Sequence, residues 1–184
     1  MSKAYIFIAD GFEEIEGLMC VDLMRRAGIE VKMFSIKDDK NVIGARGINV
    51  ITDHVIDEID DSADMLILPG GMPGTNYLNE SDKVKKTVLD YDSKGKYLAA
   101  ICAAPMVFGG MGLLKGKKAT CYPGMEDRLI GADVLTDGSP VAVDGRYITS
   151  RGLGTAIDFA LKLIEILCGK NKSEEIAASV VYKG

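Results

Sequence analysis

The feature that most constrains the fold is a series of short apolar runs that alternate with amphipathic stretches. Residues 3–9, 65–68 and 97–101 are nearly continuous apolar runs. Strands that are buried on both faces of a parallel sheet have this pattern. Between and after them, apolar residues recur at helical spacing, as over residues 13–27. We therefore predict an α/β fold, a doubly wound sandwich with a mostly parallel central sheet and helices on both faces.

The remaining elements follow from the same patterns. No repeat or linker interrupts residues 1–184, so we expect a single domain. Asp144-Gly145 is a hairpin turn signal. We expect further strands at residues 29–35, 118–120, 141–144 and 147–150, and further helices at 82–94, from 105 onward and at 155–168.

Composition excludes several classes of protein. The chain has 184 residues, of which 47% are hydrophobic and 27% charged, as in ordinary globular proteins. A formal net charge of -5 argues against a nucleic-acid partner, because phosphates require a basic face. The first apolar run is too short for a signal peptide or a membrane span, so we expect a cytoplasmic protein without a membrane partner. The four cysteines form no CxxC pair, so we expect neither a metal site nor a disulfide framework. The thiol chemistry considered below requires no cofactor.

Cys102 stands where the third apolar run ends. Pro105 suits the first turn of a following helix, which places Cys102 between a strand and a helix N-terminus. Backbone N–H groups and the helix dipole favour a thiolate there and lower the thiol pKa. The alternative is a small buried cysteine at a strand end.

The turns after three predicted strands are expected to meet in one crevice, because ligands bind at the carboxyl ends of such strands. His54, the single histidine, is remote from these turns and is interpreted as a surface or loop residue. Glu13 and Glu16 are three residues apart on one face of a first helical turn, and either is in position to partner Cys102. A carboxyl group desolvated there has a raised pKa. The alternative is an ordinary acidic first turn.

Gly70 and Gly71 follow the second of the apolar runs. Without a Cβ, they can bring backbone N–H groups close to a ligand, and with the N–H of Ala103 they are candidates for an oxyanion hole. An ordinary loop is the alternative. The stretch 70–75 lacks the Lys-Ser/Thr ending of a phosphate-binding loop.

Four motifs together resemble the ThiJ/PfpI superfamily, in its DJ-one branch. They are residues 9–16 (Ala-Asp-Gly-Phe-Glu-Glu-Ile-Glu), 68–71 (Leu-Pro-Gly-Gly), 99–105 (Ala-Ala-Ile-Cys-Ala-Ala-Pro) and 149–155 (Thr-Ser-Arg-Gly-Leu-Gly-Thr). The resemblance covers essentially the whole chain. It implies a flavodoxin-like sandwich, a homodimer, and a reactive cysteine on a strained turn.

By motif position, the resemblance assigns the reactive cysteine to Cys102 and its protonated partner to Glu16. Glu13 corresponds to a substrate-contacting glutamate, and the backbone donors correspond to Gly70, Gly71 and Ala103. Candidates for the dimer interface are Asp22, Arg26 and Arg46.

One position departs from the family pattern. Relatives often carry a His-Pro pair that approaches the cysteine, whereas this chain has Tyr122-Pro123. A phenol can hydrogen-bond to sulfur or substrate, but with a pKa of about 10 it is a weak base. Catalysis is therefore expected to depend on Glu16. Cys121, beside Tyr122, is either an inert core thiol or a second redox thiol.

Three functions are compatible with an activated thiol. The first is a glutathione-independent glyoxalase or deglycase acting on small α-oxoaldehydes or early glycation adducts through Cys102 and Glu16. The second is a redox-sensing or chaperone-like stress protein in which Cys102 is oxidised. The third is a cysteine peptidase, which needs an imidazole that this chain can supply only from another subunit.

Overall fold

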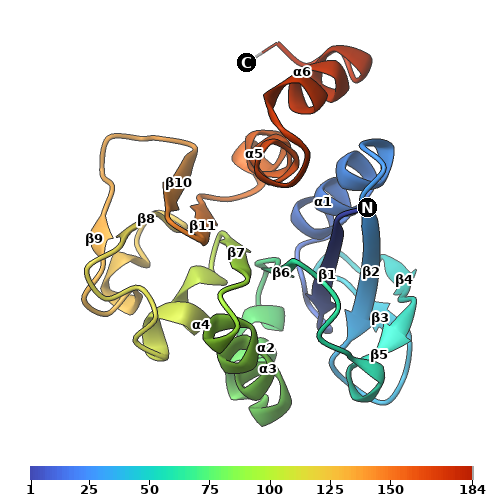
Figure 1. Cartoon of the computed structure of the whole chain (residues 1–184). Coiled ribbons are helices and arrows are strands. Elements are labelled where there is room, and N and C mark those ends of the chain that lie inside the picture. Colours follow the sequence, from blue (N-terminus) through green and yellow to red (C-terminus); the bar gives the residue numbers. More distant parts are fainter. Residues whose placement is uncertain (184) are drawn as a thin grey trace.

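A seven-stranded sheet forms the centre of the computed structural model, which describes residues 1–183 (Figure 1). The strand order is β10-β11-β7-β6-β1-β2-β5, and all neighbours are parallel except β10 and β11. The strands of this sheet are β1 (Lys3–Ile8), β2 (Glu30–Ser35), β5 (His54–Val55), β6 (Met65–Leu68), β7 (Tyr97–Ile101), β10 (Val141–Asp144) and β11 (Tyr147–Ser150).

Helices cover both faces of the sheet, as the sequence predicts (Figure 1). On one face lie α1 (Glu14–Arg26), α5 (Ala156–Cys168) and α6 (Lys170–Ser179), and on the other lie α2 (Gly74–Glu80), α3 (Asp82–Ser93) and α4 (Pro105–Gly110). Two small sheets complete the fold, the hairpin of β3 (Asn41–Ile43) and β4 (Asn49–Ile51) and the pair of β8 (Lys118–Ala119) and β9 (Asp133–Val134). No helix within residues 1–183 has both the length and the apolar character needed to cross a membrane.

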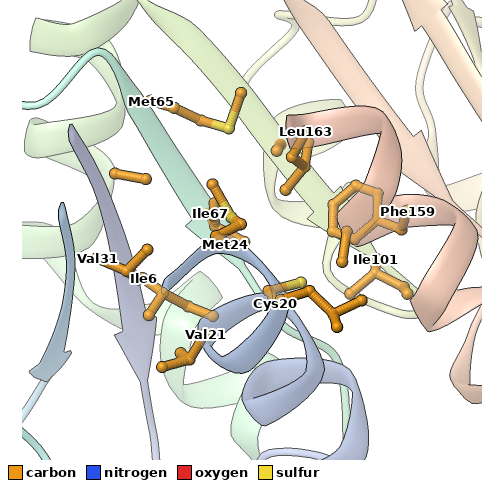
Figure 2. Packing of buried hydrophobic residues seen from close by; sticks show 14 of the residues in the cluster. Ile6, Cys20, Val21, Met24, Val31, Met65, Ile67, Ile101, Phe159 and Leu163 are labelled. Carbon is orange, nitrogen blue, oxygen red and sulfur yellow. The ribbon is translucent and has the colours of Figure 1, made fainter. Parts of the chain in front are cut away.

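The central strands are uniformly apolar because each is covered on both faces. Ile6 and Ile67 point toward α1 and α5, where they pack with Met24 and Phe159 (Figure 2). Neighbouring residues on the same strands, such as Phe7, point to the opposite face and pack against α2, α3 and α4. The two cores fix the sheet between its helices.

Several elements differ from the sequence prediction. The β3–β4 hairpin was not predicted, although Asn-Val-Ile occurs at residues 41–43 and again at 49–51 around a glycine-containing turn. Helices α2 and α6 were also not predicted, because α2 is short and α6 has a weak apolar stripe. The strands β6, β7, β10 and β11 have the predicted bounds.

Strands β7, β6 and β1 are adjacent in the sheet, so the turns that follow them lie side by side. These are the turns that carry Cys102, Gly70-Gly71 and Glu13 to Glu16. The predicted convergence at the carboxyl edge of the sheet is therefore present in the structure.

Candidate active site

Cys102 lies on a strained turn between β7 and α4. Its φ of 65° is in the left-handed region, which non-glycine residues rarely adopt. The backbone N–H of Cys102 donates to the Ser150 carbonyl on β11 (2.9 Å), and its own carbonyl accepts from Tyr122 N–H (2.8 Å). Such strain of about 1–3 kcal/mol persists where the surroundings hold it, often at functional sites.

Glu16 points from the first turn of α1 toward this cysteine. Its side chain is hydrogen-bonded to Cys102 and accepts the Gly70 N–H at Oε2 (3.1 Å). The backbone N–H of Leu153 also stabilises the carboxylate. The residue is only 1% exposed, and burial raises the pKa of Glu16 to about 7. A carboxyl group with a pKa near neutrality is suited to acid–base catalysis.

Glu13 has a different position from Glu16. It is the N-cap of α1, and its Oε2 accepts the backbone N–H of Glu16 at 2.8 Å. This hydrogen bond orients the first turn of α1. The negative charge of Glu13 also contributes to the raised pKa of Glu16. Of the two candidates, Glu16 is therefore the one whose side chain is hydrogen-bonded to Cys102, whereas Glu13 contacts the backbone of Glu16.

Gly70, which follows β6, leaves room for the side chains of Cys102 and Glu16 because it has no Cβ. A Cβ at Gly70 would lie 2.5 Å from Cys102 Cβ and 2.6 Å from Glu16 Oε2. The N–H of Gly70 is already occupied by Glu16, whereas the N–H groups of Gly71 and Ala103 face the Cys102 sulfur. Two of the three expected backbone donors thus face the Cys102 sulfur, and the third donates to the Glu16 carboxyl group.

The thiol environment differs from the sequence expectation of a lowered pKa. The N–H groups of Gly71 and Ala103 do lower the pKa of Cys102, but burial and the charge of Glu16 outweigh them and raise it to about 12. Helix α4 has only six residues, so its dipole is small. A thiolate and an ionised Glu16 therefore exclude each other at neutral pH, and the two groups titrate as a pair.

The histidine is far from this pair. His54 lies on the edge strand β5, stacks on Phe34 and approaches Glu58 Oε2 with its Nδ1 (3.2 Å). Four strand spacings separate β5 from β7, which corresponds to roughly 19 Å. The structure therefore places His54 in a short strand rather than a loop. Within one chain, its imidazole is too far away to act as a base for Cys102.

Cys121 packs with the core on the α2–α4 face, whereas Cys102 packs against the opposite core. Cys121 is 4% exposed, and burial raises its pKa to about 11. Cys121 and Arg151 both line a cavity of about 100 Å³. These features favour the inert core thiol over a second redox thiol.

The three interface candidates are exposed. On α1, Arg26 Nε forms an ion pair with Asp22 (2.8 Å). Arg46 is in the β3–β4 turn, and its backbone N–H donates to Glu14 Oε1 (2.7 Å). Exposed isoleucines, including Ile43, Ile48 and Ile51, lie on the same hairpin.

Sequence reasoning assigned no role to Gly152 and Leu153, although both belong to the fourth motif. Gly152 borders Glu16 and Tyr122, and Leu153 contributes a backbone N–H to Glu16. A cleft of about 420 Å³ lies elsewhere, between α3 and the segment around Ile56, and is lined by lysines and aspartates without a thiol. Within residues 1–183, no cluster of three histidine, cysteine or acidic residues is arranged to hold a metal ion.

Comparison with known proteins identifies the family to which the chain belongs. Residues 2–166 match the model of the DJ-1/PfpI family. The chain is 39% identical to protein dj-1beta of Drosophila melanogaster over 183 residues, which are 98% of each protein. It is 38% identical to DJ-1 homolog B of Arabidopsis thaliana but spans only 42% of that protein's length. A protein named as a deglycase in Pyrococcus abyssi is 33% identical over 90% of this chain and 99% of its own.

Solved structures show the same fold. The crystal structure of Drosophila melanogaster DJ-1beta superimposes with a TM-score of 0.95 at 37% identity, covering 100% of both chains. Toxoplasma gondii DJ-1, in a structure described as oxidized, superimposes with a TM-score of 0.93 at 36% identity, also covering 100% of both. The flavodoxin-like sandwich expected from the motifs is thereby confirmed.

Proposed function

Because this chain belongs to the DJ-1/PfpI family, as its four motifs indicate, we propose that it is a cysteine-dependent enzyme acting on small α-oxoaldehydes. The observation that carries the proposal is the hydrogen-bonded pair of Cys102 and Glu16, in which burial brings the pKa of Glu16 to about 7. The Pyrococcus abyssi relative named as a deglycase supports the same class of chemistry.

The reaction starts from a pair that holds one proton and one negative charge. The Cys102 thiol passes its proton to the Glu16 carboxylate as the sulfur attacks the aldehyde carbon of methylglyoxal and forms an S–C bond, and Glu16 passes that proton to the aldehyde oxygen. The product is a hemithioacetal. Gly71 and Ala103 N–H groups, which face the sulfur, stabilise negative charge during this step.

Glu16 then moves a proton between the two carbons. As a carboxylate, it removes the hydrogen from the former aldehyde carbon and returns it to the neighbouring carbon, while the hydroxyl proton of the hemithioacetal passes to the ketone oxygen, which leaves a thioester of lactate on Cys102. Water cleaves the thioester, releasing lactate and the thiol. Glu13 keeps Glu16 in place through the hydrogen bond to its backbone N–H. On an early glycation adduct, the sulfur attacks the carbon that carries the amine, the C–N bond breaks, and the amine of the modified protein leaves with the proton that Glu16 took from the thiol.

The test is the turnover of methylglyoxal by the purified protein in the absence of glutathione. We expect formation of lactate in the wild type and no activity above background in Cys102→Ala. Cys168→Ala, which removes an exposed thiol, is the matched control and should retain the wild-type rate. Turnover at the wild-type rate in Cys102→Ala would contradict the proposal.

A redox role is the second candidate, because the same N–H groups and Glu16 are positioned to stabilise an oxidised Cys102. The relative from Toxoplasma gondii is described in an oxidized form. Mass spectrometry after mild peroxide treatment separates the two functions. Selective oxidation of Cys102 in a protein that turns over no aldehyde would favour the redox role.

We further propose a cytoplasmic homodimer whose interface includes Asp22, Arg26 and Arg46. The exposed isoleucines of the β3–β4 hairpin support this, because apolar side chains gathered on one hairpin favour burial against a second copy. Light scattering during size exclusion should give twice the mass of the chain. A monomer at all accessible concentrations would contradict the dimer.

A further inference from the structure

Tyr122 is held beside the nucleophile by its backbone while its side chain stays available. Its N–H donates to the Cys102 carbonyl at 2.8 Å, yet the side chain is 52% exposed. Within residues 1–183 its hydroxyl has no hydrogen-bond partner, in contrast to Tyr5, Tyr147 and Tyr182, which bond to aspartates. The hydroxyl therefore does not explain the position of the ring.

The ring and the Glu16 carboxyl group both lie next to Gly152. The point that a Cβ of residue 152 would occupy is 3.4 Å from Tyr122 Cδ2 and 3.7 Å from Glu16 Oε1. Gly152 has an extended backbone, which any residue adopts, so its lack of a side chain matters for space and not for conformation. Leu153, half exposed, follows directly.

We infer that Tyr122 and Gly152 form an apolar subsite that selects α-oxoaldehydes with a planar aryl substituent over those with a methyl group. The inference rests on the proposed function. Glu16 works at the two reacting carbons, and the substituent of the second carbon lies over Gly152 against the tyrosine ring. An aryl ring gains an aromatic contact there that a methyl group does not make, which corresponds to roughly a 3- to 10-fold preference.

Turnover provides the first test. The ratio of kcat/KM for phenylglyoxal to kcat/KM for methylglyoxal is measured in the wild type, Tyr122→Phe and Tyr122→Ala. We expect Tyr122→Phe to keep the ratio, because the ring remains, and Tyr122→Ala to lower it roughly 3- to 10-fold. An unchanged ratio in Tyr122→Ala would overturn the inference, as would a loss of the ratio in Tyr122→Phe.

A second test does not depend on turnover. Phenacyl bromide carries an aryl group and bromoacetone a methyl group on the carbonyl carbon, which is the difference between phenylglyoxal and methylglyoxal. Each alkylates a thiol by forming an S–C bond as bromide leaves and the thiol proton passes to Glu16 or water. Peptide mass spectrometry gives the rate at Cys102, and the exposed Cys168 of the same chain corrects for the intrinsic reactivity of each reagent.

We expect the corrected aryl-to-methyl ratio at Cys102 to exceed one and to fall in both Tyr122→Ala and Gly152→Ala. The added methyl of Gly152→Ala lies in ordinary contact with the ring, so this variant fills the subsite without a clash. If neither aldehyde is turned over but the labelling ratio responds, the proposed function fails and the subsite stands. A labelling ratio that is the same in all variants would refute the subsite.

Discussion

Glu14 and Glu16 occupy the same first turn of α1 and are 2% and 1% exposed, but they face different parts of the molecule. Glu16 faces Cys102 and Gly70. Glu14 faces the β3–β4 hairpin, where its Oε1 accepts the Arg46 N–H and its Oε2 is buried without a hydrogen-bond partner among residues 1–183. Because both glutamates are buried, burial alone does not distinguish Glu16, for which we propose a catalytic role, from Glu14. The difference is the thiol that shares a proton with Glu16.

The largest expected effect separates the two residues by activity. Glu16→Gln removes the proton shuttle, so we expect kcat/KM for methylglyoxal to fall by a factor on the order of 100 or more. Glu14→Gln alters a carboxyl group that faces the hairpin, so we expect kcat/KM to remain within about threefold of the wild type. Equal losses in the two variants would remove the distinction.

The pH dependence of stability should separate them next. The pKa of Glu16 is raised to about 7 in the folded protein, from an ordinary value of 4.5. Between pH 4.5 and pH 7, Glu16 is protonated in the folded chain but ionised in the unfolded chain. The contribution of Glu16 to the free energy of unfolding is therefore complete below pH 4.5 and is lost as the pH rises to 7. The loss is on the order of 3 kcal/mol.

Urea unfolding at pH 4.5 and pH 8 measures this contribution. The difference in unfolding free energy between wild type and Glu16→Gln should shrink or change sign in favour of the variant as the pH rises. The difference between wild type and Glu14→Gln serves as the control for the other titrating groups. A pH-independent difference for Glu16→Gln would show that its carboxyl group is not held protonated.

A pair of glycines gives the third comparison. A Cβ at Gly70 would lie 2.6 Å from Glu16 Oε2, and a Cβ at Gly44 would lie 2.3 Å from the Glu14 carboxyl carbon. Each alanine variant should lower the unfolding free energy by about 1–3 kcal/mol, because both sites are fully packed. Only Gly70→Ala should also lower kcat/KM, since it pushes apart Cys102 and Glu16. An active Gly70→Ala enzyme would mean that the pair tolerates separation.

The smallest effect concerns the hydrogen bond of Glu14 to the hairpin. Glu14→Gln keeps a carbonyl oxygen for the Arg46 N–H but loses the charge that strengthens this bond. We expect an unfolding free energy about 1 kcal/mol lower, measured by urea unfolding at pH 7. A loss above about 3 kcal/mol would indicate that the charge has a further partner.

The sequence predicted the sheet well, because apolar runs and turn residues are local signals, whereas the choice of Glu16 over Glu13 came from the family resemblance. The strands β6 and β7 have their predicted bounds, and Cys102 adopts the strained turn that the motif implies. The role of Glu14 and the hairpin was not predictable, since it depends on a contact between residues 14 and 46 that no spacing rule reveals. The thiol environment was misjudged because burial is a property of the assembled core.

The central claim is that Cys102 and Glu16 form a coupled pair, in which the charge of Glu16 contributes to the raised pKa of the buried thiol. Titration of the Cys102 thiolate by ultraviolet absorbance, with Cys168→Ala in the background, tests it directly in the wild type and in Glu16→Gln. An amide in place of the carboxyl group carries no charge that opposes a thiolate. The account predicts a thiolate that forms only well above neutral pH in the wild type and a lower apparent pKa of Cys102 in Glu16→Gln. An unchanged or higher pKa of Cys102 in the variant would contradict it.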